Sequence, residues 1–98
     1  MLAINQHTNA GFSITFDNGW TASIQFAKHN YCSNQFEEET EQQCQDAEIA
    51  ALNSNSDTDE WHSFGDDTIR GWVNANEIVD FLVEIRGKKP TALKARQM

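Results

Sequence analysis

The stretch Gly11–Phe26, GFSITFDNGWTASIQF, decides the fold of this chain. On both sides of its central Asp-Asn-Gly, apolar and polar residues alternate with period two, which predicts a β-hairpin. A two-residue loop would place apolar side chains of one strand beside polar side chains of the other. A three-residue loop, Asp17 to Gly19, gathers the large side chains on one face, so the burial pattern favours it, and Gly19 supplies the left-handed third residue. The predicted pairs are Phe16 with Trp20, Ile14 with Ala22 and Phe12 with Ile24.

The second strong signal is a helix near residues 75–86. Asn74 is a good N-cap with Glu77 three residues later, and Gly87 followed by Pro90 ends the helix. An apolar stripe recurs at helical spacing: Ile78, Phe81, Leu82 and Ile85. This stripe must lie on the sheet, because nothing else is large enough to cover Phe12, Ile14, Phe16 and Ile24. The predicted fold is α+β, a four- or five-stranded antiparallel sheet with one C-terminal helix packed on one face.

The remaining signals are weaker. Ala47–Leu52 and Trp61–Phe64 flank a polar loop and predict a second hairpin, although the alanines leave a helical turn at 47–52 as an alternative. Thr68–Trp72 predicts a short edge strand. Residues 27–46 have no periodicity and predict a long mobile loop, disordered around 34–45. We expect residues 1–87 to form a single α+β domain, followed by a basic C-terminal tail at 88–98.

Charge is sorted along the chain. Residues 1–85 carry all 15 acidic residues and only Lys28 and Arg70 as cations, a net charge of −13, whereas residues 86–98 carry five cations and no acid. Such a body repels nucleic acid and membrane surfaces and attracts basic partners, so direct nucleic-acid binding is not expected. The chain has no apolar run long enough to cross a bilayer and no signal peptide, which predicts a cytoplasmic protein.

No catalytic or firm metal-binding motif stands out. His29 and Cys32 form the only tightly spaced ligand pair, and Cys44 lies across the predicted mobile loop, whereas structural zinc sites usually show two tight pairs. An acidic surface also disfavours a reactive thiolate. We therefore expect free thiols, no catalytic residue, no metal and no cofactor, and we expect that the protein is not an enzyme.

The sequence offers better candidates for residues that bind a partner than for catalytic residues or metal ligands. Trp20 is assigned to the inner face of the sheet, Trp61 to either face, and Trp72 to a lid over the core. Exposed aromatic residues dominate interface energetics, and clustered carboxylates are steered to basic grooves. The predicted partner-binding residues are Tyr31, Glu37, Glu38, Glu39, Glu41, Asp57, Asp59, Glu60 and Trp61.

The hairpin Gly11–Phe26, followed by Asn30-Tyr-Cys32, resembles small proteins carried by bacteriophages, prophages and plasmids. Ala47–Ala50 and Gly71-Trp72 before a Glu-containing helix at 76–82 fit the same pattern. The resemblance covers about half the chain and implies an accessory protein of a mobile element, without catalytic residues to transfer.

These observations lead to two functional hypotheses. The first is a non-enzymatic acidic accessory protein that binds a host or phage protein with a basic surface and inhibits a host-defence or nucleic-acid-handling complex by charge mimicry. The alternative is a self-assembling, dimeric module that sequesters a small ligand on its free sheet face. In that alternative, Trp61 or His62 lies with Tyr31 on the face that the helix leaves open.

Overall fold

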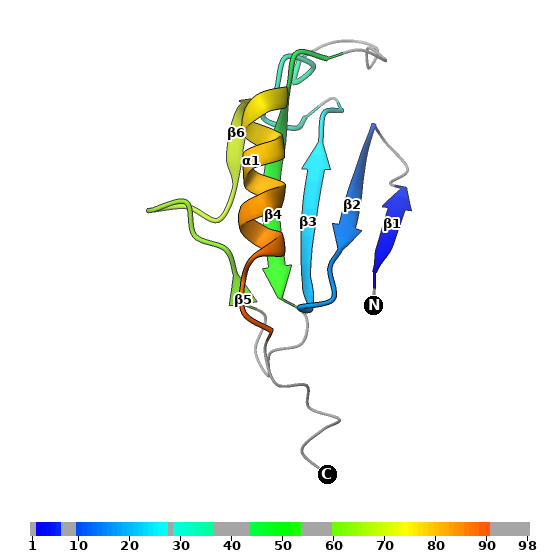
Figure 1. Ribbon diagram of the computed structural model, residues 1–98. Helices are drawn as coiled ribbons and strands as arrows, with labels where there is room; N and C mark the ends of the chain where they lie inside the picture. Colours follow the sequence, from blue (N-terminus) through cyan, green and yellow to red (C-terminus); the bar gives the residue numbers. More distant parts are fainter. Residues whose placement is uncertain (1, 7–9, 28, 37–43, 54–59, 91–98) are drawn as a thin grey trace.

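The computed structural model describes residues 2–6, 10–27, 29–36, 44–53 and 60–90 (Figure 1). Within these ranges the chain forms one antiparallel sheet and one helix. The elements are β1 (Ala3–Gln6), β2 (Gly11–Thr15), β3 (Trp20–Gln25), β4 (Asp46–Asn53), β5 (Glu60–Trp61), β6 (Arg70–Asn74) and α1 (Ala75–Arg86). The strand order is β1-β2-β3-β4-β5, and β6 pairs with the opposite end of β4. The predicted α+β class is confirmed, with a sheet of five to six strands.

The hairpin has the predicted register. Phe12 pairs with Ile24 and Ile14 with Ala22. The Phe16 amide donates to the Trp20 carbonyl oxygen at 2.8 Å, which closes the three-residue loop. Gly19 has a φ of +91°, the left-handed conformation that such a loop requires at its last position. Burial of one face therefore decides the register, as the alternation of the sequence indicates.

The segment at 47–52 is a strand, and the helical alternative is wrong. Every second residue of β4 is buried, namely Ala47, Ile49, Ala51 and Asn53. Ile49 pairs with Ile24 and Ala51 with Ala22 across β3. Two long neighbouring strands outweigh the helical preference of alanine, since the sheet buries one complete face of β4. The second hairpin also forms through β5, and the predicted edge strand at 68–72 is observed at 70–74.

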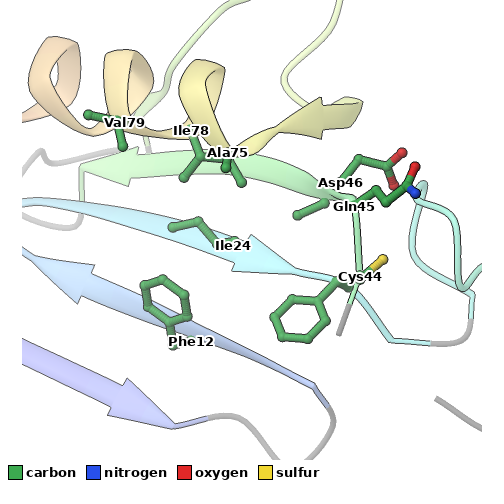
Figure 2. A pocket seen from close by; sticks show the side chains of 10 residues that line it. Phe12, Ile24, Cys44, Gln45, Asp46, Ala75, Ile78 and Val79 are labelled. Carbon is green, nitrogen blue, oxygen red and sulfur yellow. The ribbon is translucent and has the colours of Figure 1, made fainter. Parts of the chain in front are cut away.

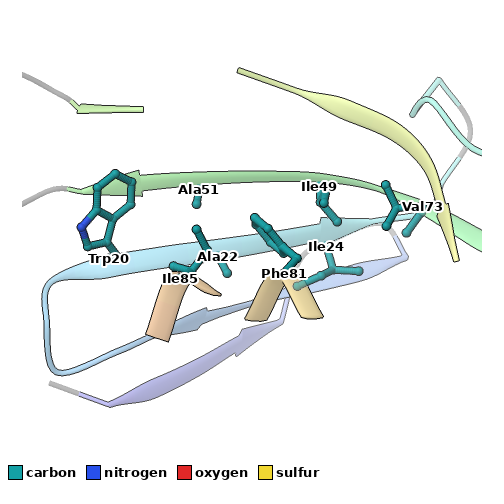
Figure 3. Packing of buried hydrophobic residues seen from close by; sticks show 9 residues of the cluster. Trp20, Ala22, Ile24, Ile49, Ala51, Val73, Phe81 and Ile85 are labelled. Carbon is teal, nitrogen blue, oxygen red and sulfur yellow. The ribbon is translucent and has the colours of Figure 1, made fainter. Parts of the chain in front are cut away.

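Helix α1 spans the predicted residues and begins with a complete capping box. The Glu77 amide donates to Asn74 Oδ1 at 2.9 Å, and the Asn74 amide donates to Glu77 Oε1 at 3.1 Å. Phe81 and Ile85 are buried against the strands, as Figure 3 shows. The buried cluster consists of Trp20, Ala22, Ile24, Ala47, Ile49, Ala51, Val73, Phe81 and Ile85.

The helix covers less of the sheet than its stripe predicts. It packs on β3, β4 and β6, and it leaves the β1–β2 side open (Figure 1). Phe12 and Phe16 pack only against the margin of the buried cluster. β1, which the sequence analysis did not predict, adds an edge strand in which Ile4 is 78% exposed. The periodicity of β1 is too short to separate it from a loop.

Candidate functional site

The sheet face opposite α1 is open, and we call it the helix-free face. Its residues alternate in sequence with those that face the helix: Ser13, Thr15, Thr21, Ser23, Gln25, Glu48, Ala50, Leu52 and Trp61. The centre of the face is polar and internally paired. The hydroxyl oxygens of Thr15 and Thr21 are 2.9 Å apart, and Gln25 Nε2 donates to Ser23 Oγ at 3.1 Å.

A hollow of about 380 Å³ lies on this face. Its lining combines a floor of small and polar side chains with the apolar side chains of Leu52, Trp61 and Ile69. Trp61 is 49% exposed and Ile69 is exposed beside it. Trp61 stands opposite Leu52 in the register of β4 and β5, which places its indole on the helix-free face. The hollow is therefore open to a partner and has an aromatic wall.

A stacked aromatic pair lies close to Glu48, one of the residues that line this hollow. The rings of Tyr31 and Trp72 have centroids 5.8 Å apart and an interplanar angle of 27°. The Trp72 amide donates to the Tyr31 carbonyl oxygen at 2.8 Å. Glu48 joins the pair to the hollow, because it lines the hollow and its carboxylate accepts from the Tyr31 amide at 2.9 Å and from Asn30 Nδ2 at 3.3 Å.

Trp72 is held in a strained, exposed conformation. Its φ is +52°, in the left-handed region that costs a residue with a side chain about 1–2 kcal/mol. The side chain is 55% exposed, so the prediction of a core lid is wrong, whereas Trp20 is buried as predicted. The bulge between Ala47 and Ile49 in the pairing of β4 with β6 turns the backbone at this point. Neighbouring Gly71 has no room for a Cβ atom, which would lie 2.5 Å from Tyr31 Cβ.

The structure describes three of the nine predicted partner-binding residues. Trp61 lies on the helix-free face, and Tyr31 stacks on Trp72. Glu60 is exposed on β5 and accepts from Asn53 Nδ2 at 3.3 Å. The other six, Glu37, Glu38, Glu39, Glu41, Asp57 and Asp59, lie outside the described residues. The exposure of Ile69 beside Trp61 and of Trp72 beside Tyr31 was not predicted from the sequence, because it depends on the bulge and on where β6 joins β4.

His62 lies on the opposite side of the sheet from Trp61. It is buried, with its ring 4.8 Å from that of Phe64 and 6.1 Å from that of Phe81. Burial lowers the pKa of His62, the charge of Lys88 lowers it further, and Glu84 opposes both effects. His62 is thus a packing residue under the helix and cannot join Tyr31 on the helix-free face.

The two cysteines lie together. The Sγ atoms of Cys32 and Cys44 and a carboxylate oxygen of Asp46 are all within 4.8 Å of one another, in a group that contains neither His29 nor His62. Both thiols are free, as predicted. The pairing of Cys32 with His29, and the separation of Cys44 from both by a mobile loop, are not what the structure shows, since the Cys32 and Cys44 sulfur atoms lie close together. The turns over residues 29–36 bring Cys32 to the start of β4, while residues 37–43 of the predicted disordered segment lie outside the described residues.

A second hollow, of about 440 Å³, opens between α1 and β2 on the helix side (Figure 2). Phe12, Ile24, Ile78 and Val79 form its apolar walls, and Cys44 lies at one end. It exists because the helix is displaced from the β1–β2 side of the sheet. No observation in the described part of the chain identifies an occupant.

Comparisons with protein-family models, with curated proteins and with solved structures give no match. The described residues include no helix with the length and apolarity needed to traverse a bilayer.

Proposed function

We propose that this protein is a non-enzymatic binding module that docks its helix-free face on a basic surface of a partner protein. The observation that carries the proposal is Trp72, a bulky residue that is half exposed at a φ of +52° and stacked on exposed Tyr31. Residues in sparsely populated backbone conformations cluster at functional sites, so a strained and exposed aromatic residue supports a role in binding.

Energetics support an interface at this face. Trp and Tyr are enriched among residues that contribute most to binding, particularly beside pockets from which a partner excludes water. Tyr31, Trp61 and Trp72 are 47%, 49% and 55% exposed, so each has a large ring surface left to bury. Stacking restricts both rings before binding, and the bond from the Trp72 amide to the Tyr31 carbonyl oxygen joins their backbones, which reduces the entropy lost on association.

Charge supports a basic partner. Glu48 lies on the helix-free face, where it lines the hollow and accepts from the Tyr31 amide, whereas Glu60 stands opposite Asn53 on the helix side of the sheet and adds only to the overall charge. The net charge of −13 over residues 1–85 would steer a Lys- or Arg-lined surface toward the protein, with an association rate that falls as salt rises. The resemblance to phage and plasmid proteins favours a host or phage protein as partner, including a defence or nucleic-acid-handling complex with a basic cleft.

The test compares variants of the tagged full chain as baits in a bacterial lysate. Trp72→Gly removes the ring and relieves the positive φ, so we expect it to change the free energy of unfolding by less than about 1 kcal/mol. Val83→Ser is the matched control, because Val83 is 51% exposed on α1, on the other side of the sheet. Wild type and V83S should retain the same stoichiometric partner at low salt and release it at high salt, and W72G should retain at least tenfold less.

Two results would contradict this proposal. If W72G retains as much of the partner as wild type, the aromatic pair does not bind it. If W72G loses several kcal/mol of stability, Trp72 has a structural role and its strain carries no functional meaning. Trp61→Ser removes a second exposed aromatic ring, at the other end of the face, and its partner retention tests independently whether this face binds the partner.

The hollow on the helix-free face supports one alternative, a dimer or a small-ligand site. Its volume of about 380 Å³ falls in the range of small-molecule sites, and its apolar wall above a polar floor is typical of them. Sedimentation equilibrium distinguishes the readings. A dimer that dissociates on Trp61→Asp but persists in Val83→Asp supports self-assembly through this face, whereas a monomer for all three proteins contradicts the dimer and leaves partner binding or a small-ligand site.

A further inference from the structure

We propose that Cys32, Cys44 and Asp46 form a binding site for a thiophilic divalent cation, with zinc as the expected metal. The two thiols and the carboxylate come from two segments, Cys32 from the turns after β3 and the other two from the start of β4. Cys32 is buried, Cys44 and Asp46 are half-buried, and all three ligand atoms converge within 4.8 Å. Thiolates with a carboxylate are a ligand set that Zn²⁺ accepts.

The spacing fits a tetrahedral ion. Zn–S bonds of about 2.3 Å and Zn–O bonds of about 2.0–2.2 Å place two sulfur atoms about 3.8 Å apart and a sulfur and an oxygen about 3.5 Å apart. The observed ligand atoms, all within 4.8 Å of one another, therefore need to approach by at most about 1.3 Å, within the reach of side-chain rotation. Three protein ligands leave one tetrahedral position for water.

The surroundings orient the ligands. Ser33 donates to Asp46 Oδ1 from its amide at 2.7 Å and from its hydroxyl at 2.9 Å, and the hydroxyl is also 2.9 Å from Oδ2. Such outer hydrogen bonds fix a ligating carboxylate. The Asn34 amide hydrogen-bonds the Cys32 sulfur, an interaction that stabilises a thiolate. Asn34 is itself buried and its Nδ2 donates to the Phe26 carbonyl oxygen at 2.8 Å, which holds the turn in place.

A divalent cation would offset the negative charge that two thiolates and the Asp46 carboxylate bring within 4.8 Å of one another. Binding replaces the two thiol protons with one divalent ion: each sulfur gives its proton to solvent and its electron pair to the metal, and nothing is oxidised or reduced. The ion would then link Cys32 to Cys44, which flank a sequence that contains Glu37, Glu38, Glu39 and Glu41.

The test is a Co²⁺ titration of the reduced full chain in a phosphine reductant, followed by displacement with Zn²⁺. One cobalt per chain with thiolate-to-cobalt charge-transfer absorption, abolished by one equivalent of zinc, is the expected result. Asp46→Asn should weaken binding by more than about tenfold, and Ser33→Ala by about 10–100-fold as a positioning residue. Asp66→Asn, which alters an exposed carboxylate in the turn before β6, is the control and should bind as wild type.

Because the wild-type spectrum decides the matter, the test does not depend on whether Cys32→Ser or Cys44→Ser folds. Absence of thiolate-to-cobalt absorption in reduced wild type would overturn the proposal. If the chain also loses both free thiols on mild oxidation, the pair is a disulfide-forming dithiol instead. Cobalt binding that Cys44→Ser and D46N leave unchanged would place the metal elsewhere and overturn it equally.

Discussion

Replacing Asn18 tests how much the hydrogen bonds between the hairpin turn and the C-terminal end of α1 contribute to stability. Asn18 is buried, and its Nδ2 donates to three carbonyl oxygens at the C-terminal end of α1: Ile85 at 2.8 Å, Arg86 at 3.2 Å and Lys88 at 3.0 Å. Its Oδ1 accepts from the Trp20 amide at 3.0 Å. The last carbonyl groups of a helix have no hydrogen-bond donors within the helix. The Asn18 side chain supplies those donors, although it lies 67 to 70 positions away in the sequence.

The magnitude follows from these bonds. One amide group has two N–H donors, and each hydrogen bond contributes a net 0.5–1.5 kcal/mol, approximately, with a further penalty where the Ile85 carbonyl is left buried without its donor. Asn18→Ala should therefore cost about 2–3 kcal/mol. Asn18→Asp should cost about 1 kcal/mol more, because its carboxylate cannot donate and would face the negative end of the helix dipole. The backbone of Asn18 has no positive φ, so neither change adds strain there.

Urea unfolding, followed by tryptophan fluorescence and far-UV circular dichroism, measures these free energies. Asn76→Ala is the control, because Asn76 is exposed on the first turn of the same helix. N76A should stay within about 0.5 kcal/mol of wild type. If N18A is equally mild, or if N18D is no less stable than N18A, Asn18 does not cap the helix and the reasoning fails.

Three further outcomes are expected. Asn74→Ala should cost about 1 kcal/mol in urea unfolding, because it removes the capping box with Glu77, and an unchanged midpoint would contradict that role. Because the pKa of His62 is lowered in the native state, the unfolded state takes up a proton at a higher pH than the native state does. The free energy of unfolding should therefore fall as the pH drops through the ordinary histidine pKa of about 6.5. His62→Gln should flatten that part of the pH profile, and parallel profiles for the two proteins would contradict this prediction. Gly71→Ala should destabilise by about 1–3 kcal/mol and displace Tyr31, since the new Cβ would lie 2.5 Å from Tyr31 Cβ; wild-type stability with unaltered near-UV circular dichroism would show that the turn yields freely.

Structural features that depend on residues close together in the sequence could be predicted from the sequence alone. The three-residue turn ending at Gly19, the pairing of Phe12 with Ile24 and the capping box at Asn74 all follow from local sterics, alternation and helix-end hydrogen bonding. The class of the fold follows too, because one apolar strand face and one apolar helix stripe must cover each other. The turn, the register of the hairpin and the capping box do not depend on which distant segments meet.

Tertiary structure alone decided where the ends of long connections meet. The sequence predicts that Asn18 makes a turn, but its contact with the end of α1 depends on how the helix lies across β3. Trp72 is exposed because β6 joins β4 through a bulge, and Cys32 reaches Cys44 because Asp46 and Glu48 carboxylates hold the turns over residues 29–36. Contacts of this kind have no local periodicity, so only the packed sheet and helix determine them.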